Sequence, residues 1–449
     1  MRVQGDIERD LNFGALTAAD ERQLLENGLA SDSQARAKLS QNRATERMSW
    51  VFSAFVAGYI FFEVPGGWLG DLWGARFIIF RIVLCWSLFT ALTGGVKWIG
   101  HLFSAVPSAG LLFALLVAVR FCFGLGEAGA YPNIARALAR WVPFQERARG
   151  QSWIWFSSRL GGAFAPAIIG GLMWLAGGWE QAFWCLGVIG IVWAIGFFFW
   201  FRDRPEDKRG VSQAEVEAIR GTAGPGSVYD DGKPPALPWK ALFSPRLLAF
   251  DLAGFCVSFC FYFYITFLPK YLKEEFQIDY SQSQFLTGLP LLLGAVACLA
   301  GGWLSDELIR RTGQKRWGRS IMPLIGWTAA GLCALVVSQL RSPVAIMVLI
   351  CVAFVFQDLG VPSMWSLPAD IGGRYAGTVG GCMNTAGSIG GMLSPLMAAK
   401  VSIAFGWHAT FVVFGIVYLV GALSWLVIDA SKPLGFTSSP RMRRDAGPF

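Results

Sequence analysis

The feature that most constrains the fold of this chain is a series of apolar runs, each roughly 20 residues long, that begins near Met48. A run of that length is what a helix needs to cross the hydrocarbon core of a bilayer. The 449 residues are 54% hydrophobic and only 15% charged, a composition that is not typical of a soluble domain. We therefore predict an all-α membrane protein whose first partner is the lipid bilayer.

Eleven spans are predicted. The amino half, residues 48–201, holds five, at about 48–68, 77–96, 111–136, 152–175 and 181–201. The carboxyl half, residues 244–430, holds six, at about 248–271, 285–304, 320–340, 344–366, 378–404 and 409–428. Residues 1–47 form a polar amino-terminal tail in which a short helix is expected, residues 202–243 form a polar linker, and residues 431–449 form a second tail.

Two internal repeats relate the halves. The sequence GGWLGD at residues 66–71 returns as GGWLSD at residues 301–306, and AGGWEQAF at 176–183 returns as AFGWHATF at 404–411. The offsets are nearly equal, and each match lies beside corresponding spans. This predicts two parallel repeats of transmembrane helices, as in transporters whose halves are related by an axis along the membrane normal.

The repeat also predicts that the amino half lacks its first helix. The span at 248–271, shifted back by 235 residues, should have a counterpart at 13–36, but that window contains six charged residues. An isolated helix with so many charges is not stable in lipid. Two explanations are open: a truncated or misframed start, or a genuine eleven-span design.

Basic residues concentrate in alternate links, at 136–150, 202–243 and 305–319. By the positive-inside rule these links are cytoplasmic, and so is the carboxyl tail. The same distribution explains the net charge of +8 as an orientation signal in a cell membrane, and no nucleic-acid partner is expected. Nine cysteines scattered through apolar segments and only two histidines provide no metal site or catalytic triad, so we expect neither an enzyme nor a cofactor.

Two charged residues interrupt the third apolar run. Arg120 lies near its middle and Glu127 follows seven residues later, close to two helical turns. Both side chains therefore fall on one face of a helix, about 10.5 Å apart along its axis. A charge at the bilayer centre is unfavourable by at least ~2.5–3.5 kcal/mol on insertion scales, so it normally faces a cavity or a partner. We interpret the two residues as lining a water-accessible passage; the alternative is a static ion pair that helps helices to pack.

The loop after the first span reads GWLGDLWGAR over residues 67–76. It resembles the signature loop of the major facilitator superfamily, although Leu72 stands where that family has an arginine. Asp71 and Arg76 in this loop, and Asp306 with Arg310 in the second half, are the predicted gating residues. The alternative for Asp71 is a purely structural turn.

Longer stretches narrow the resemblance to the anion:cation symporter family of that superfamily. These stretches are WVFSAFVAGYIFFEVPGGWLGD, RFCFGLGEAGAYPNIARALARWVPFQERARGQ, FYITFLPKYL and DIGGRYAGTVGGCMNTAG. The resemblance implies that Arg120 binds the anion and that Glu127 is the proton-coupling carboxylate. It also implies substrate contacts from Tyr59 and Asn384, and for Tyr59 ordinary packing is the alternative.

Two further residues complete the predicted substrate site. Arg159, in WFSSRLGGAFAP, is a second anion contact or else extends to the interface. Trp365 is expected to stack on the ligand, and the alternative is a packing or membrane-interface tryptophan, as most of the 20 tryptophans must be. Glu63 is expected to be interhelical, while Asp251 and Asp358, near span ends, are left undecided.

These features predict a monomeric secondary transporter that moves a small organic anion with protons by alternating access. The expected substrate is a sugar acid, such as a hexuronate, aldonate or aldarate, or a similar carboxylate. The absent helix and Leu72 leave one alternative of another class: a degenerate or truncated relative that acts as a non-transporting membrane protein or ligand sensor.

Overall fold

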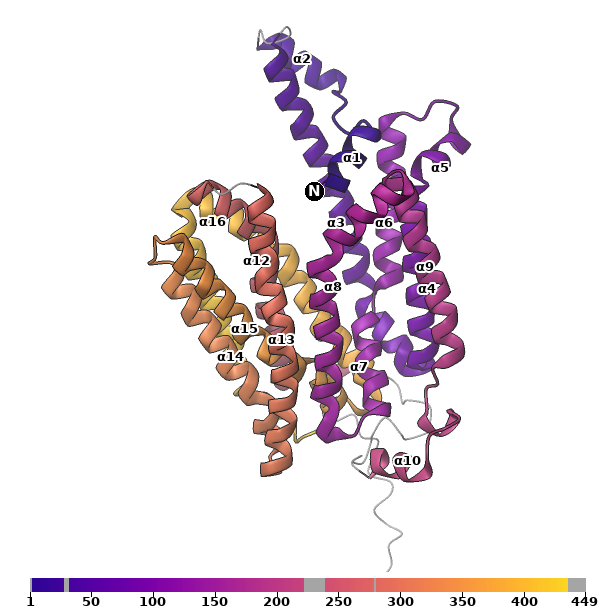
Figure 1. The fold of residues 1–449 in the computed structure, drawn as a ribbon, viewed down its shortest axis with the longest axis vertical. Helices are drawn as coiled ribbons and strands as arrows, with labels where there is room; N and C mark the ends of the chain where they lie inside the picture. Colours follow the sequence, from indigo (N-terminus) through magenta and orange to yellow (C-terminus); the bar gives the residue numbers. More distant parts are fainter. Residues whose placement is uncertain (1, 28–31, 222–238, 278–279, 435–449) are drawn as a thin grey trace, which may run out of the picture. The chain divides into compact units, whose positions relative to one another are not determined.

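The computed structural model describes residues 2–27, 32–221, 239–277 and 280–434, and every regular element in these ranges is a helix (Figure 1). Parts of the predicted linker (222–238) and of the second tail (435–449) lie outside the described residues. The chain divides into two compact units. The first comprises Met1–Glu63, Ile79–Ala128 and Phe164–Trp200; the second comprises Val64–Ile78, Gly129–Ala163 and Phe201–Phe449.

The first unit is built on four long apolar helices joined by shorter ones. Its elements are α1 (Arg2–Asp10), α2 (Ala18–Glu26), α3 (Ser33–Trp73) up to Glu63, α4 (Ala75–Gly94) from Ile79, α5 (Val96–Phe103), α6 (Ala109–Glu127), the last part of α8 (Arg147–Ala176) and α9 (Trp179–Trp200). Glycines let these helices approach closely, which is how transmembrane helices pack without a hydrophobic driving force between them. A Cβ on Gly126 of α6 would lie 2.8 Å from Cys85 of α4, and one on Gly187 of α9 would lie 2.8 Å from Ala91 of α4.

The predicted polar tail contributes more helix than expected. It forms α1, α2 and the first turns of α3, which begins at Ser33 and continues into the first predicted span. Thr17 and Asp20 close a capping box at the start of α2. The Asp20 carboxylate, only 1% exposed, also accepts hydrogen bonds from the Arg43 guanidinium at 2.6–3.0 Å.

The second unit surrounds a large apolar core. It holds α7 (Ala130–Trp141), the first part of α8, α10 (Gln213–Arg220), α11 (Trp239–Leu242), α12 (Pro245–Phe276), α13 (Tyr280–Thr312), α14 (Lys315–Val337), α15 (Pro343–Ile371) and α16 (Ala376–Ser424). Short 3-10 turns lie at Phe144–Glu146, Pro205–Asp207 and Gly373–Tyr375.

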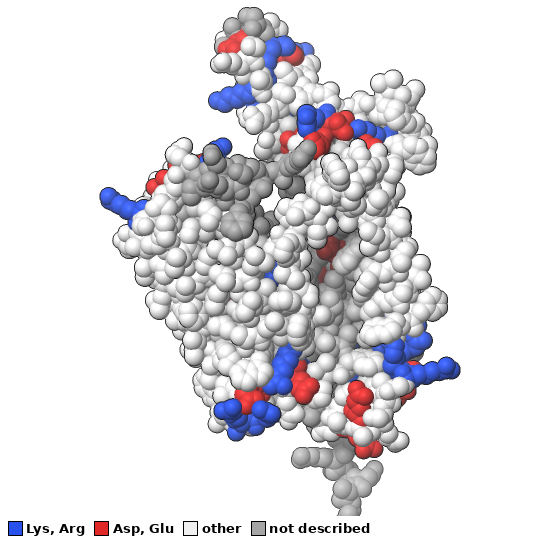
Figure 2. All heavy atoms as spheres, viewed as in Figure 1, with Lys and Arg blue, Asp and Glu red and all other residues white. Residues whose placement is uncertain are grey.

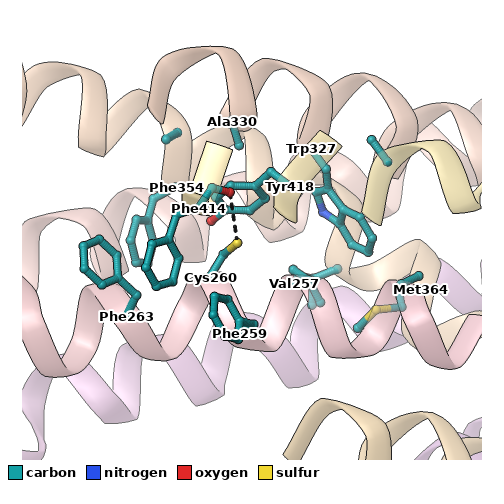
Figure 3. Close-up of a cluster of buried hydrophobic side chains, with 14 of the residues drawn as sticks. Val257, Phe259, Cys260, Phe263, Trp327, Ala330, Phe354, Met364, Phe414 and Tyr418 are labelled. Carbon is teal, nitrogen blue, oxygen red and sulfur yellow. Dashed lines mark hydrogen bonds between the residues drawn. The ribbon is translucent and has the colours of Figure 1, made fainter. Parts of the chain in front are cut away.

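Aromatic side chains from α12, α15 and α16 fill this core (Figure 3). The rings of Phe263 and Phe414 stack with their centroids 4.0 Å apart, and the Cys260 thiol donates to the Phe414 carbonyl at 3.5 Å. Tyr418 and Trp327 close the same cluster and are fully buried. The carboxyl half therefore provides a rigid frame for α15, which carries polar groups along its length.

Ten helices among the described residues are long and apolar enough to cross a membrane. Figure 2 agrees, because the charged side chains on the visible face gather toward the helix ends and leave a largely uncharged middle. The last predicted spans, 378–404 and 409–428, both lie in α16, which bends at Gly406 (φ 80°, ψ 175°). The multi-span helical architecture is confirmed, whereas the exact count of eleven and the missing first helix stay predictions.

The third predicted span, 111–136, is not one continuous helix. α6 ends at Glu127 and α7 begins at Ala130, with Gly129 between them at φ +89°. A Cβ on Gly129 would lie 2.8 Å from the Gly66 carbonyl carbon of α3. Only glycine combines a left-handed conformation with so close a backbone approach, and this breaks the helix immediately after Glu127.

Candidate functional site

One cluster of candidate residues lies on α6 of the first unit. Arg120 and Glu127 occur on this one helix, as predicted, and both are half-buried. The Arg120 guanidinium lies 5.5 Å from the Phe123 ring centroid. Neither side chain forms a hydrogen bond or an ion pair with a residue that the structure describes. The alternative of a closed ion pair between them is therefore not what this structure contains.

Close packing of α3 on α6 brings Tyr59 to the same helix pair. A Cβ on Gly124 of α6 would lie 2.1 Å from the Phe55 carbonyl oxygen and 2.7 Å from the Tyr59 nitrogen. Likewise, a Cβ on Gly58 of α3 would lie 2.2 Å from the Phe121 carbonyl oxygen. The Tyr59 side chain is half-buried, with its ring 6.0 Å from that of Phe55.

A separate cluster of candidate residues lies in the second unit, around Arg159 of α8. This side chain is 7% exposed and does not extend to an interface. Its Nε donates to Asp358 Oδ2 at 2.8 Å and its Nη2 donates to Asp358 Oδ1 at 2.9 Å. The guanidinium also lies 4.1 Å from the Phe261 ring centroid and 5.3 Å from that of Trp155. Asp358, left undecided by the sequence, thus holds one of the predicted anion contacts.

Three aromatic rings adjoin this pair. Tyr131 of α7 stacks on Trp155 of α8, with centroids 4.9 Å apart and planes 9° from parallel. Trp365 of α15 lies 5.3 Å from Tyr131 and 5.5 Å from Trp155. Tyr131 and Trp155 were missed by the sequence analysis. One signal was available, since Trp155 precedes Arg159 by four residues and so shares its helix face.

Asn384, the remaining predicted substrate contact, lies in the first arm of α16 and is half-buried. Beside it in sequence, the Thr385 hydroxyl is buried without a hydrogen-bond partner among the described residues. For metal binding, the described residues contain no group of three or more histidine, cysteine, aspartate or glutamate side chains suited to hold an ion.

Asp71, the first predicted gating residue, is buried in the second unit and pairs with an arginine that the sequence analysis did not name. It accepts from Arg136 of α7 at 2.7 Å. Its carboxylate also accepts from the backbone nitrogens of Gly377 and Thr378, at 3.0 and 2.7 Å, at the start of α16. The backbone nitrogen of Arg76, in contrast, donates to Asp203 at 3.0 Å.

Asp306 repeats this arrangement, and its arginine partner differs from the predicted one. Its carboxylate accepts from Arg319 of α14 at 2.5 Å and from the backbone nitrogens of Ala148 and Arg149, at 3.3 and 2.8 Å, at the start of α8. The predicted partner Arg310 instead contacts Glu307 at 2.5 Å and is 67% exposed. Each aspartate therefore binds the amino end of a helix from the other repeat, where the helix dipole favours negative charge.

Arg319 connects Asp306 to a wider network of ion pairs. Its Nε donates to Asp370 of α15 at 2.7 Å, and Asp370 also accepts from Arg147 of α8 at 3.0 Å. Arg136, Arg147, Arg319 and Asp370 are all partners that sequence reasoning did not select. The spacing of the charges along the chain gave no signal for them, because each bond joins residues on different helices, 13 to 223 positions apart in sequence.

Comparison with known proteins places these features in context. The sequence model of the Major Facilitator Superfamily matches residues 38–395. A probable sulfoacetate transporter of Cupriavidus necator is 33% identical over 400 residues, which cover 88% of this chain and 87% of that protein. A D-galactonate transporter of Escherichia coli is 30% identical over 392 residues, with 85% and 86% covered.

Solved structures show the same fold at low sequence identity. The human organic anion transporter TETRAN superposes with a TM-score of 0.62 at 18% identity, covering 94% of this chain and 89% of that one. A proton:xylose symporter superposes with a TM-score of 0.66 at 14% identity, covering 88% and 89%.

Proposed function

The chain belongs to the major facilitator superfamily, and on that premise we propose that it moves a small organic anion together with protons by alternating access of two helical halves. It is a multi-pass membrane protein, and its relatives are anion transporters of the anion:cation symporter family, not enzymes. The proposal concerns the finer points: the class of anion, the coupling to protons, the residues responsible and action as a monomer.

The observation that carries the proposal is the pair of half-buried charged groups on α6, Arg120 and Glu127, which form no ion pair with a described residue. A guanidinium in a low-dielectric site binds a carboxylate through two parallel hydrogen bonds. A carboxyl group beside it takes up a proton when the site opens to the acidic side of the membrane. Glu127 is also the last residue of α6, where the carboxyl end of the helix disfavours a negative charge.

A sugar acid fits the other proposed contacts. Relatives are named for sulfoacetate, D-galactonate, and galactarate or D-glucarate, all of them small organic anions. Tyr59 and Asn384 offer a hydroxyl and an amide to substrate hydroxyl groups, and Trp365 offers an aromatic face to the apolar side of a sugar chain. Arg159 would supply a second contact for an acidic group.

We propose that Asp71 and Asp306 gate the cytoplasmic side. The support is that each aspartate binds the start of a helix from the other repeat, so a single movement would break both sets of bonds. The ion pairs lie beside the links 136–150 and 305–319, which are rich in arginine and lysine and are cytoplasmic by the positive-inside rule. This orientation also places the carboxyl terminus in the cytoplasm.

Uptake into proteoliposomes tests the proposal. D-galactonate, a hexuronate and sulfoacetate are offered outside vesicles with an alkaline interior. We expect the pH gradient to stimulate uptake, and Glu127→Gln to retain substrate binding but to show a reduced stimulation. A suitable control is Glu63→Gln, which also removes a carboxylate from a transmembrane helix of the first unit and is expected to keep the gradient response. Arg120→Lys keeps the positive charge but loses the planar pair of N–H donors of the guanidinium. We therefore expect a higher half-saturating concentration of the substrate anion.

Full gradient-stimulated uptake by Glu127→Gln would contradict the coupling role. Binding of these acids without any uptake would instead favour the ligand-sensor alternative. The two results are distinguished by measuring binding and uptake on the same preparation.

A further inference from the structure

The Arg159–Asp358 pair is a buried charge pair that the proposed Arg120 and Glu127 chemistry does not use. Asp358 is fully buried and Arg159 is 7% exposed. The two hydrogen bonds, at 2.8 and 2.9 Å, join Nε and Nη2 of the guanidinium to both carboxylate oxygens. This is the planar bidentate geometry by which arginine also binds the carboxylate of a ligand. Asp358 therefore occupies the face of Arg159 that an anionic substrate would need.

The surroundings of Asp358 fix it in place without neutralising it. Gln357 Nε2 donates to its Oδ1 at 3.0 Å, and Gln357 is itself held by the Tyr418 hydroxyl at 2.5 Å. A Cβ on Gly294 of α13 would lie 2.3 Å from Asp358 Oδ2. Tyr418 belongs to the aromatic core of Figure 3, so this side of the pair is rigid.

Arg159 is the charged partner of Asp358, and the other titratable groups near the pair are phenols and thiols. They are contributed by four helices: Tyr131 of α7, Cys298 of α13, Tyr418 of α16 and, beside Tyr418, Tyr264 and Cys260 of α12. On its other side the guanidinium meets the rings of Phe261 and Trp155. The charge on each member of the pair is thus balanced by the other member.

One uncommitted polar atom lies on the side of the pair formed by α8. The Trp155 indole nitrogen is buried and has no hydrogen-bond partner among the described residues. Trp155 lies against Arg159, Tyr131 and Trp365. A buried donor without a partner is unfavourable, which suggests that a ligand oxygen satisfies it at another stage of the cycle.

We propose that Asp358 and Arg159 form a second proton and anion switch, in which a substrate carboxylate replaces Asp358 on the guanidinium when Asp358 is protonated. A proton adds to one carboxylate oxygen of Asp358, and the hydrogen bonds from Nε–H and Nη2–H to this carboxylate open. The same two N–H groups then donate to the carboxylate of the entering anion. The inference rests on the proposed function and assigns this pair a coupling role within it.

Charge balance explains why this exchange would enforce symport. Before it, the site holds Arg159 as a cation and Asp358 as an anion; after it, the site holds the same cation, a neutral acid and one carboxylate. The net charge is zero in both states. A proton alone would leave a buried guanidinium unpaired, and an anion alone would leave two carboxylates competing for one arginine. Both are strongly disfavoured in a low-dielectric interior.

The proton-to-anion ratio tests the inference. Proton influx, followed with a pH-sensitive dye inside proteoliposomes, is measured together with uptake of labelled D-galactonate. We expect Asp358→Asn, which is nearly isosteric, to transport with one proton fewer per anion than wild type. Arg159→Lys is expected to raise the half-saturating concentration by roughly tenfold. A purely structural pair would leave the ratio unchanged in any variant that folds.

Asp358→Asn leaves an unpaired buried arginine, so the double variant Arg159→Gln/Asp358→Asn provides a second test. The double variant removes both charges together, and we expect it to fold, as judged by thermal unfolding in detergent. It should bind the anion weakly and carry one proton fewer per anion than wild type. A wild-type ratio in either folded variant overturns the switch. If that ratio is unchanged while Glu127→Gln still shows a reduced stimulation, the proposed function stands and only this inference fails. If wild type takes up none of the acids, both fail.

Discussion

Arg319→Met tests the ion-pair network of the second unit. Arg319 is completely buried, and its guanidinium donates to Asp306 at 2.5 Å, to Asp370 at 2.7 Å and to the Phe144 carbonyl at 2.8 Å. Methionine retains much of the side-chain volume and removes the charge. The variant therefore isolates electrostatics from packing.

The expected loss in the free energy of unfolding depends on which partners each carboxylate keeps when Arg319 is replaced. Breaking a buried ion pair by removing one partner typically destabilises a protein by about 3–5 kcal/mol, because the other charge stays buried and uncompensated. Arg319 serves two carboxylates, but Asp370 keeps Arg147 at 3.0 Å and Asp306 keeps two backbone N–H groups. We therefore expect a loss within about 3–5 kcal/mol and not twice that value.

Denaturant unfolding in detergent micelles, followed by tryptophan fluorescence, measures the change; the chain has 20 tryptophans. Arg310→Met is the matched control, since Arg310 also pairs with a carboxylate but is 67% exposed. Exposed ion pairs contribute little, so the control should unfold nearly as wild type does. Adding Asp306→Asn to Arg319→Met should recover part of the loss. Equal effects of Arg319→Met and Arg310→Met would refute the reasoning.

Three further predictions use the same preparations. Gly124→Ala places a Cβ 2.1 Å from the Phe55 carbonyl oxygen and should lower the free energy of unfolding by about 1–3 kcal/mol, as overpacking does. Gly196→Ala, with nothing within 4 Å, is its control, and equal losses would contradict the close packing of α3 on α6. Gly129→Ala, at φ +89°, should be destabilised by at least about 1–2 kcal/mol, the left-handed penalty of a side chain; wild-type unfolding would count against the helix break. Hydrogen bonds from Arg43 lower the pKa of Asp20 below its usual value. Its stabilisation of α2 is thus complete above the unfolded pKa of ~3.9 and disappears as pH falls through the folded value. The protection factors of the α2 amides, meaning the intrinsic exchange rate at each pH divided by the measured rate, should fall on acidification in wild type but much less in Asp20→Asn, and identical profiles would refute the assignment.

Local sequence properties were sufficient for the membrane-spanning helices. The apolar runs predicted α4, α9 and α14 closely, because a helix satisfies its own backbone hydrogen bonds and only needs enough apolar length. The same reasoning missed the break after Glu127 and joined α6 to α7, since a glycine inside an apolar run does not reveal whether another backbone approaches it.

What the sequence determined by itself is the class of protein: a helical membrane protein with two related halves and an arginine and a glutamate on one helix face. What only the tertiary structure decided is which charges meet. Arg159 and Asp358 are separated by 199 residues, and Arg136 and Asp71 by 65. Hydrophobic length is a property of one segment and can be read along the chain, but an ion pair depends on two helices packed at one depth and rotation, which spacing along a single sequence does not encode.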